Sequence, residues 1–316
     1  MQMSQSQFFV FIEGKNSDGF VHGSNCDRAL ADIKVSYEMI RSDQIGGTGS
    51  GKTRLLSHFK SLSDANLLIN NFKGKMTASV FFMDKDLDDF HGTIVKSDHV
   101  IYTQFYDVES HIFAEGDIRL AVSATCNLSP QRVRQELPAA GAWQSRIARY
   151  WQEWVRLCFV ANTLRLEGEA NYGRPSPLNP KPYEPPDPEL VKAFELRSHK
   201  LARRIGPNGC QDWTAGRVLV DQLYASNRQD EIFKGKWYAE ILARFLFDLD
   251  PEIDKRALAV TLVKQMAITM KFESAWSRDV QSRVQSLAIA AGIQFPKQRS
   301  ENISTGIDES ENSSVP

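Results

Sequence analysis

The sequence predicts an α/β fold, in which a mostly parallel sheet flanked by helices is followed by an all-α C-terminal part. Two continuous apolar runs, residues 8–12 and 79–83, are typical of strands buried on both faces of a parallel sheet. β-rich and helical segments alternate over about the first 120 residues, and helical spacing prevails after them. We therefore expect an α/β domain over residues 1–125, a helical domain over 126–296 and a disordered tail over 297–316.

In the first part, the strand at residues 8–12 ends at Glu13, and a glycine that permits a tight turn follows it. Four further elements are predicted before the strand at 79–83. These are a helix at 27–37, an extended segment at 37–40, a helix after the glycine-rich residues 46–51 and a helical stretch at 67–72. Residues 100–103 are rich in β-formers and predict a last strand.

Helical signals dominate the second part. Ser129 precedes a proline and is a typical helix start, and apolar residues at steps of three and four predict one long amphipathic helix over 143–166. Its tryptophans are expected in the core. The stretch 173–188 contains seven prolines and predicts a loop. Asp187 then caps a helix toward Gly206, and further helices are expected at 238–247, 253–270 and 274–291.

The composition is that of a globular protein, with 42% hydrophobic and 24% charged residues. No apolar run approaches the length of a membrane span. The run at 8–12 is only five residues long and follows polar Gln and Ser residues, so we do not expect it to be part of a signal peptide. The four cysteines form no CxxC pair, which predicts free thiols in the cytoplasm. Residues 1–125 carry 12 basic and 16 acidic side chains, whereas residues 126–296 carry 24 and 19, so the second part is mildly basic and suited to a polyanion.

Acidic residues follow three of the predicted strands. Glu13 follows the first, Asp84 and Asp86 follow the strand at 79–83, and Asp107 and Glu109 follow the last. A parallel sheet brings such residues to one edge, where they form an oxygen-only site for Mg²⁺ or Mn²⁺. Asp84 and Asp86 project the same way if the chain between them stays extended. The structural alternative is that the acids cap the next helix, as Asp88 and Asp89 are expected to do.

A second interpretation concerns the glycines. Residues 46–53 match the P-loop pattern, with Gly46, Gly51, Lys52 and Thr53 at its defining positions and Asp84 as the acid that would hold Mg²⁺. A P-loop, however, follows a buried strand directly, whereas residues 41–45 are mostly polar. This nucleotide-binding alternative also leaves Glu13 without a role.

The residues Phe11-Ile12-Glu13-Gly14, the glycine-rich turn and Met83-Asp84-Lys85-Asp86 resemble the TOPRIM fold. The chain is more closely similar to a bacterial TOPRIM-like family in which EGKxxD, an Ile-Gly-Gly turn, a DxDxD run and a Tyr-Asp-x-Glu segment precede a helical half. That family resembles the nuclease effector of the PARIS phage-defence system. The resemblance covers residues 8–125 well and the remainder in outline.

The resemblance implies a Mg²⁺- or Mn²⁺-dependent endonuclease acting in a toxic anti-phage response. Glu13 would be a metal ligand or general acid/base, and Asp84 and Asp86 would hold the metal. Asp18 and Glu109 would be candidates for a second metal, although Asp18 lies five residues after Glu13 where relatives can have four. The resemblance further implies RNA such as tRNA as substrate, release from a partner ATPase of the ABC type, and an active homodimer.

Basic residues supply candidate contacts to the nucleic acid. Lys15 follows the first strand, and Arg197, Lys200, Arg203 and Arg204 lie late in the helix that begins after Asp187. Cations also favour a helix C-terminus for dipole reasons alone, and Lys15 is equally explained as a solvated side chain. A non-catalytic interaction module is the third class of function that the sequence leaves open.

Overall fold

The computed structural model describes residues 6–14, 17–33, 35–49, 51–72, 74–138, 141–166, 170–206, 208–254 and 257–293. Its centre is a five-stranded sheet in which β2, β1, β4 and β3 lie in that order and β5 also pairs with β4. The strands are β1 (Phe8–Ile12), β2 (Tyr37–Arg41), β3 (Ile69–Phe72), β4 (Lys75–Met83) and β5 (Val100–Tyr102). All pairings are parallel except that of β3 with β4, which confirms the predicted mixed α/β architecture.

Strand β4 organises the sheet because it is longer than its neighbours. Its residues 78–82 pair with β1 along one side, while β3 and β5 share its other side in succession. The prediction of a helix at residues 67–72 is wrong, because Ile69–Phe72 form β3, which pairs antiparallel with β4. The amino-terminal part of β4 extends beyond β1 and offers backbone groups that an antiparallel strand can pair with.

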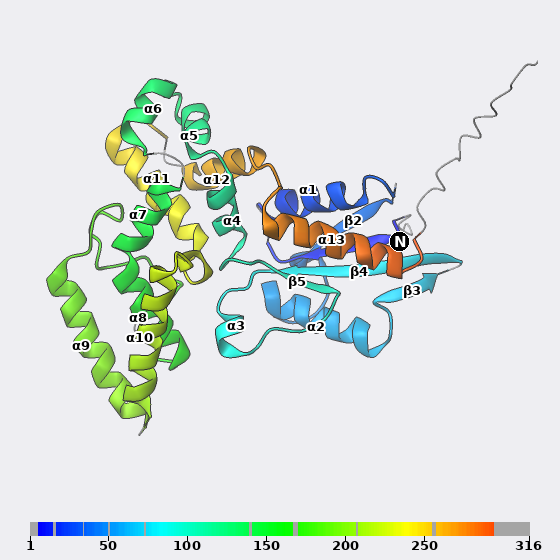
Figure 1. Ribbon diagram of the computed structural model, residues 1–316, viewed down its shortest axis with the longest axis horizontal. Helices are drawn as coiled ribbons and strands as arrows, with labels where there is room; N and C mark the ends of the chain where they lie inside the picture. The colour runs from blue at the N-terminus through cyan, green and yellow to red at the C-terminus, as the bar shows by residue number, and fades with distance from the viewer. Residues whose placement is uncertain are drawn as a thin grey trace, which may run out of the picture.

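Helices cover both faces of the sheet (Figure 1). On one face Phe82 stacks on His22 of α1 (Asp18–Leu30), and α1 packs along α13 (Ala275–Ala290). On the other face Phe81 meets Phe59 of α2 (Gly51–Asp64) in an edge-to-face contact. Helix α13 comes from the far end of the described chain, so the expected second part is not purely a separate helical body.

The remaining helices gather beside the carboxyl edge of the sheet (Figure 1). They are α4 (Val108–Glu115), α5 (Ile118–Cys126), α6 (Pro130–Glu136), α7 (Ala142–Tyr150), α8 (Gln152–Thr163), α9 (Pro188–Ile205), α10 (Gly209–Ala225), α11 (Gly235–Leu249) and α12 (Leu258–Ile268). Three short elements complete the fold: the 3₁₀ turns η1 (Ser42–Gln44) and η2 (Gln229–Glu231), and α3 (Asp88–His91). One buried hydrophobic cluster runs from the sheet into these helices.

Several helix boundaries follow the sequence signals. Ser129, Asp187 and Ser274 each accept a hydrogen bond from a backbone N–H of the helix they precede, as their residue types predict. The proline-rich stretch before α9 contains no helix among its described residues. None of the helices in the described ranges is long and apolar enough to cross a membrane.

Other boundaries differ from the predictions. The first helix is α1 rather than residues 27–37, and the single helix expected over 143–166 is broken at Trp151 into α7 and α8. Helix α12 is shorter than the predicted residues 253–270, and α10 was not predicted. Trp143, Trp151 and Trp154 lie in the core as expected. The predicted disordered tail, residues 297–316, lies outside the described residues.

Candidate functional site

Three neighbouring parallel strands deliver acidic residues to one edge of the sheet. The register pairs Ile12 of β1 with Phe82 of β4, and Met83 of β4 with Tyr102 of β5. Glu13 and Asp84 therefore leave adjacent strands within one residue of the same level, and the segment after β5 brings Asp107 and Glu109 beside them. The structure thus brings together the acids that the sequence suggested, and their charges act on one another.

Glu13 lies between the sheet and the start of α2. Burial raises the pKa of its carboxyl above the ordinary value, although the charge of Lys52 and a hydrogen bond from the Lys52 backbone N–H oppose this. The charges of Asp86 and Asp18 raise it further. Its Oε2 is buried and accepts no hydrogen bond from the described residues. One carboxylate oxygen is therefore left for a cation or a proton.

Asp84 is a buried carboxylate at the end of β4, with a relative exposure of 9%. Its Oδ1 accepts a hydrogen bond of 3.1 Å from the Val108 backbone N–H, at the start of α4. Burial, followed by the charges of Asp18 and Asp107, raises the pKa of this carboxyl well above its ordinary value. Asp18 begins α1 and accepts a 2.7 Å hydrogen bond from the Gly14 backbone N–H, which closes the turn after Glu13.

Asp86 does not continue the extended line of β4. Its φ is +49°, in the left-handed region, and its N–H donates to the Tyr106 carbonyl at 2.8 Å. The condition under which Asp84 and Asp86 project the same way is therefore not met. The Asp86 Oδ2 lies 2.5 Å from the Lys52 Nζ, which also contacts Asp88 at 3.0 Å. Asp84 is thus buried, whereas the Asp86 side chain is 42% exposed.

The third group of acids is fixed by contacts between α4 and α11. Asp107 caps α4, and its Oδ1 accepts hydrogen bonds from the Ser110 N–H and from the Gly235 N–H at the start of α11. Glu109 is buried, and the Ser17 hydroxyl lies 3.4 Å from its Oε1. Burial and then the charge of Asp107 raise the pKa of Glu109 to about 8.

Lys236 is a member of the site that the sequence did not reveal. It is the second residue of α11, and it lines a cavity of about 190 Å³ together with Glu109. Burial alone would lower the pKa of its ammonium, but the charges of Glu109 and Asp84 raise it above the ordinary value. The helix predicted for this region began only at residue 238, so Lys236 was not recognised as part of it. A lysine in the first turn of a helix is unfavourable for the helix dipole, and such a placement is the one local sign that Lys236 has another role.

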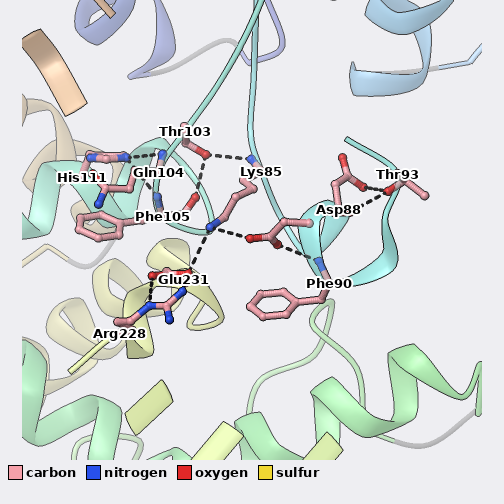
Figure 2. A network of polar contacts seen from close by, with 11 residues as sticks. Lys85, Asp88, Phe90, Thr93, Thr103, Gln104, Phe105, His111, Arg228 and Glu231 are labelled. Carbon is pink, nitrogen blue, oxygen red and sulfur yellow. Dashed lines mark hydrogen bonds and ion pairs between the residues drawn. The ribbon is translucent and has the colours of Figure 1, made fainter. Parts of the chain in front are cut away.

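Lys85 connects the acidic turn to the helical part (Figure 2). Its buried Nζ lies 3.1 Å from Asp89 and 3.5 Å from Glu231 of η2, which also pairs with Arg228. Its backbone N–H donates to the Thr103 hydroxyl at 2.8 Å. These contacts with Asp89, Glu231 and Thr103 fix the turn that carries Asp84 and Asp86.

The donor set is suited to a hard divalent cation, because it consists of carboxylates with one unpartnered oxygen on Glu13. In the described part of the chain, no group of three or more Asp, Glu, His or Cys side chains is arranged to hold a metal ion. Two of the acids are instead engaged, Asp84 with the start of α4 and Asp86 with Lys52. Binding of a metal at this edge would require Asp86 to exchange its present partner.

The P-loop residues have a different environment from the one that nucleotide binding requires. Strand β2 lies at the edge of the sheet and is followed by η1, so no buried strand runs directly into Gly46. The Lys52 ammonium contacts two aspartates and its N–H bonds to Glu13, while Thr53 is exposed.

The basic residues on α9 lie far from the carboxylates. Arg197, Lys200, Arg203 and Arg204 are exposed, and α9 lies at the opposite end of the molecule from the sheet (Figure 1). Lys15 lies outside the described residues. The α9 residues could therefore contact only a distant part of a long nucleic acid bound at the sheet edge.

Comparison with protein-family models and with curated proteins finds no match for this chain.

Proposed function

We propose that the chain is a metal-dependent phosphodiesterase of the TOPRIM type, an endonuclease that uses Mg²⁺ or Mn²⁺. The observation that carries the proposal is the convergence of three acids on one edge of the sheet: Glu13 and Asp84 follow the adjacent parallel strands β1 and β4, and Glu109 lies on α4, which follows β5. Several acids whose charges raise one another's pKa are unfavourable in an isolated fold, and a divalent cation offsets their repulsion. The unpartnered oxygen of Glu13 supports the same conclusion.

The chain's residues have distinct roles under this proposal. Asp84, Asp86 and Glu109 supply oxygen ligands, with Asp18 as a further candidate beside Glu13. When bound, the cation supplies positive charge for the scissile phosphate. Glu13, whose pKa burial raises, takes the proton of the attacking water. Lys236 lies beside Glu109 and offers a positive charge to the phosphate from the helical side.

Substitution of Glu13 and Asp86 tests the proposal. Glu13→Gln and Asp86→Asn preserve side-chain size, so we expect a folded protein whose cleavage of nucleic acid falls by about a thousand-fold or more. Thermal unfolding of each purified variant checks the fold. RNA and DNA sequencing from cells that express the wild type or Glu13→Gln identifies the cleaved polymer. Full cleavage by both variants would refute the mechanism.

The finer parts of the proposal rest on the resemblance stated for the sequence. They are RNA, such as tRNA, as the substrate, release from an ABC-type ATPase partner, and an active homodimer in the cytoplasm. Co-expression with an ABC-type ATPase partner should suppress the toxicity of the wild type. Light scattering of the released protein should give the mass of a dimer, and a monomer that still cleaves would contradict this part.

A P-loop NTPase is the second candidate, because Lys52 lies at the start of α2 beside the acidic turn after β4. It predicts tight binding of ATP in the presence of Mg²⁺ and its loss in Lys52→Ala. Calorimetry distinguishes the two functions, since the phosphodiesterase proposal expects no tight ATP binding by the wild type.

A further inference from the structure

Lys52 is held inside the carboxylate cluster by two ion pairs. Its Nζ lies 2.5 Å from Asp86 Oδ2 and 3.0 Å from Asp88 Oδ2, and its side chain is only 15% exposed. Asp86 is 42% exposed and Asp88 is 22% exposed. The lysine thus reaches its partners from the protein side and leaves the outer side of Asp86 open to solvent.

The backbone of Lys52 is fixed more firmly than its ammonium. Its N–H bonds to the Glu13 carboxylate. The preceding Gly51 has φ +49°, a conformation that favours glycine, and a Cβ there would lie 2.9 Å from Glu13 Oε1 and press on that carboxylate. By contrast, the ammonium stands on a flexible four-carbon stem. Lys52 can therefore change partners at its Nζ while the start of α2 stays against Glu13.

We propose that Lys52 is the exchangeable counter-ion of the site, which occupies Asp86 until a divalent cation binds there and then contacts a phosphate oxygen of the polynucleotide. This inference rests on the proposed function. A divalent cation and an ammonium repel each other at one carboxylate, so binding of the first releases the second. Asp88 keeps the released ammonium near the sheet edge, where a phosphate approaches.

The proposal predicts that metal affinity and cleavage move in opposite directions when Lys52 loses its charge. Lys52→Met removes the competitor at Asp86, and an ion pair of this exposure corresponds to up to about a five-fold gain in affinity for Mn²⁺. The same change removes the contact to phosphate, so cleavage at saturating Mn²⁺ should fall about ten-fold or more. If Lys52 had only a structural role, its substitution would lower both the Mn²⁺ affinity and the cleavage rate, or change neither.

Two measurements on the full chain test the inference. Calorimetric titration with MnCl₂ gives the metal affinity, and a time course with labelled total tRNA gives the cleavage rate. Lys52→Arg retains the charge and should keep the metal affinity of the wild type. Lys60→Met, at an exposed position of the same helix outside the site, makes the same chemical change and is the matched control, which should change neither quantity. If Lys52→Met does not fold, as thermal unfolding will show, Lys52→Gln replaces it.

The outcomes separate this inference from the proposed function. If Lys52→Met binds Mn²⁺ no more tightly than the wild type, or cleaves as fast, the counter-ion role is overturned while the phosphodiesterase stands. If Glu13→Gln cleaves like the wild type, the proposed function itself is overturned. Tighter Mn²⁺ binding together with slower cleavage supports the inference.

Discussion

Gly235 should be among the least replaceable residues of the fold, although it lies far in sequence from every acid of the site. It begins α11, and its N–H donates to Asp107 Oδ1 at 3.1 Å. A Cβ at this position would overlap the Ser110 backbone nitrogen and Asp107 Oδ1, and would lie 2.7 Å from the Glu109 carbonyl carbon. Gly235→Ala must therefore push the start of α11 away from the start of α4.

The magnitude follows from two contributions. The overlap is mainly with backbone atoms, which cannot rotate aside, and overpacking of this kind costs about 1–3 kcal/mol. Separation of the helices also weakens the hydrogen bond to the charged Asp107, which contributes about 1.5–3 kcal/mol. We expect Gly235→Ala to lower the free energy of unfolding by about 2–5 kcal/mol, a large share of the stability of a typical domain.

Urea denaturation of the wild type and Gly235→Ala measures this loss. Gly46→Ala is the matched control, because Gly46 is exposed and a Cβ there meets no atom within 4 Å. That variant should remain within about 0.5 kcal/mol of the wild type. If Gly235→Ala also stays within this limit, α4 and α11 are not locked together as described. The placement of Glu109 and Lys236 in one site would then lose its structural basis.

Three further predictions concern the same region. Because the pKa of Glu109 rises from its ordinary value of 4.5 to about 8, the folded chain retains a proton that the unfolded chain releases. In the presence of a chelator, the contribution of Glu109 to the free energy of unfolding should therefore be greatest below pH 4.5 and should decrease as the pH rises toward 8. Thermal unfolding measured over this pH range should show a smaller decrease for Glu109→Gln than for the wild type. Gly51→Ala should displace α2 from Glu13 and lower Mn²⁺ affinity in calorimetry, and an unchanged affinity would contradict the close packing. Lys85→Met should lower the free energy of unfolding, measured with urea, by only about 1–2 kcal/mol, because Glu231 keeps Arg228 as a partner. A larger loss would contradict the stabilising role of the Arg228 pair.

The buried strands could be predicted from sequence because their signal is local. Phe8–Ile12 and the end of β4 are apolar on both faces, and the structure buries both faces. Acids placed directly after such strands must reach the same edge of a parallel sheet. The grouping of Glu13 with Asp84 therefore needed no knowledge of tertiary contacts beyond the parallel arrangement, whereas Glu109 lies on α4 and is brought near by the contact of that helix with Asp84.

The first helix shows where local reasoning fails. Helix α1 contains Gly19, Gly23 and Asn25, which are weak helix formers, so the apolar pattern pointed to residues 27–37 instead. In the fold, Val21 and Cys26 of α1 are buried in the core cluster that includes Phe82 of β4. This burial outweighs the unfavourable propensity. The same reasoning applies to β3, whose residues become a strand because β4 provides an unpaired edge.

The conformation of Asp86 is the clearest limit of sequence reasoning at the site itself. Alternation along a strand predicts that residues two apart face the same way, but only while the chain stays extended. The chain turns at Asp86 because its N–H is bound by the Tyr106 carbonyl, a contact with the segment that follows β5. The two aspartates consequently have different surroundings, since Asp84 is buried against the start of α4 and Asp86 is open to solvent beside Lys52. An open aspartate paired with a lysine can exchange that partner, whereas the enclosed Asp84 cannot leave the start of α4 without disturbing the fold.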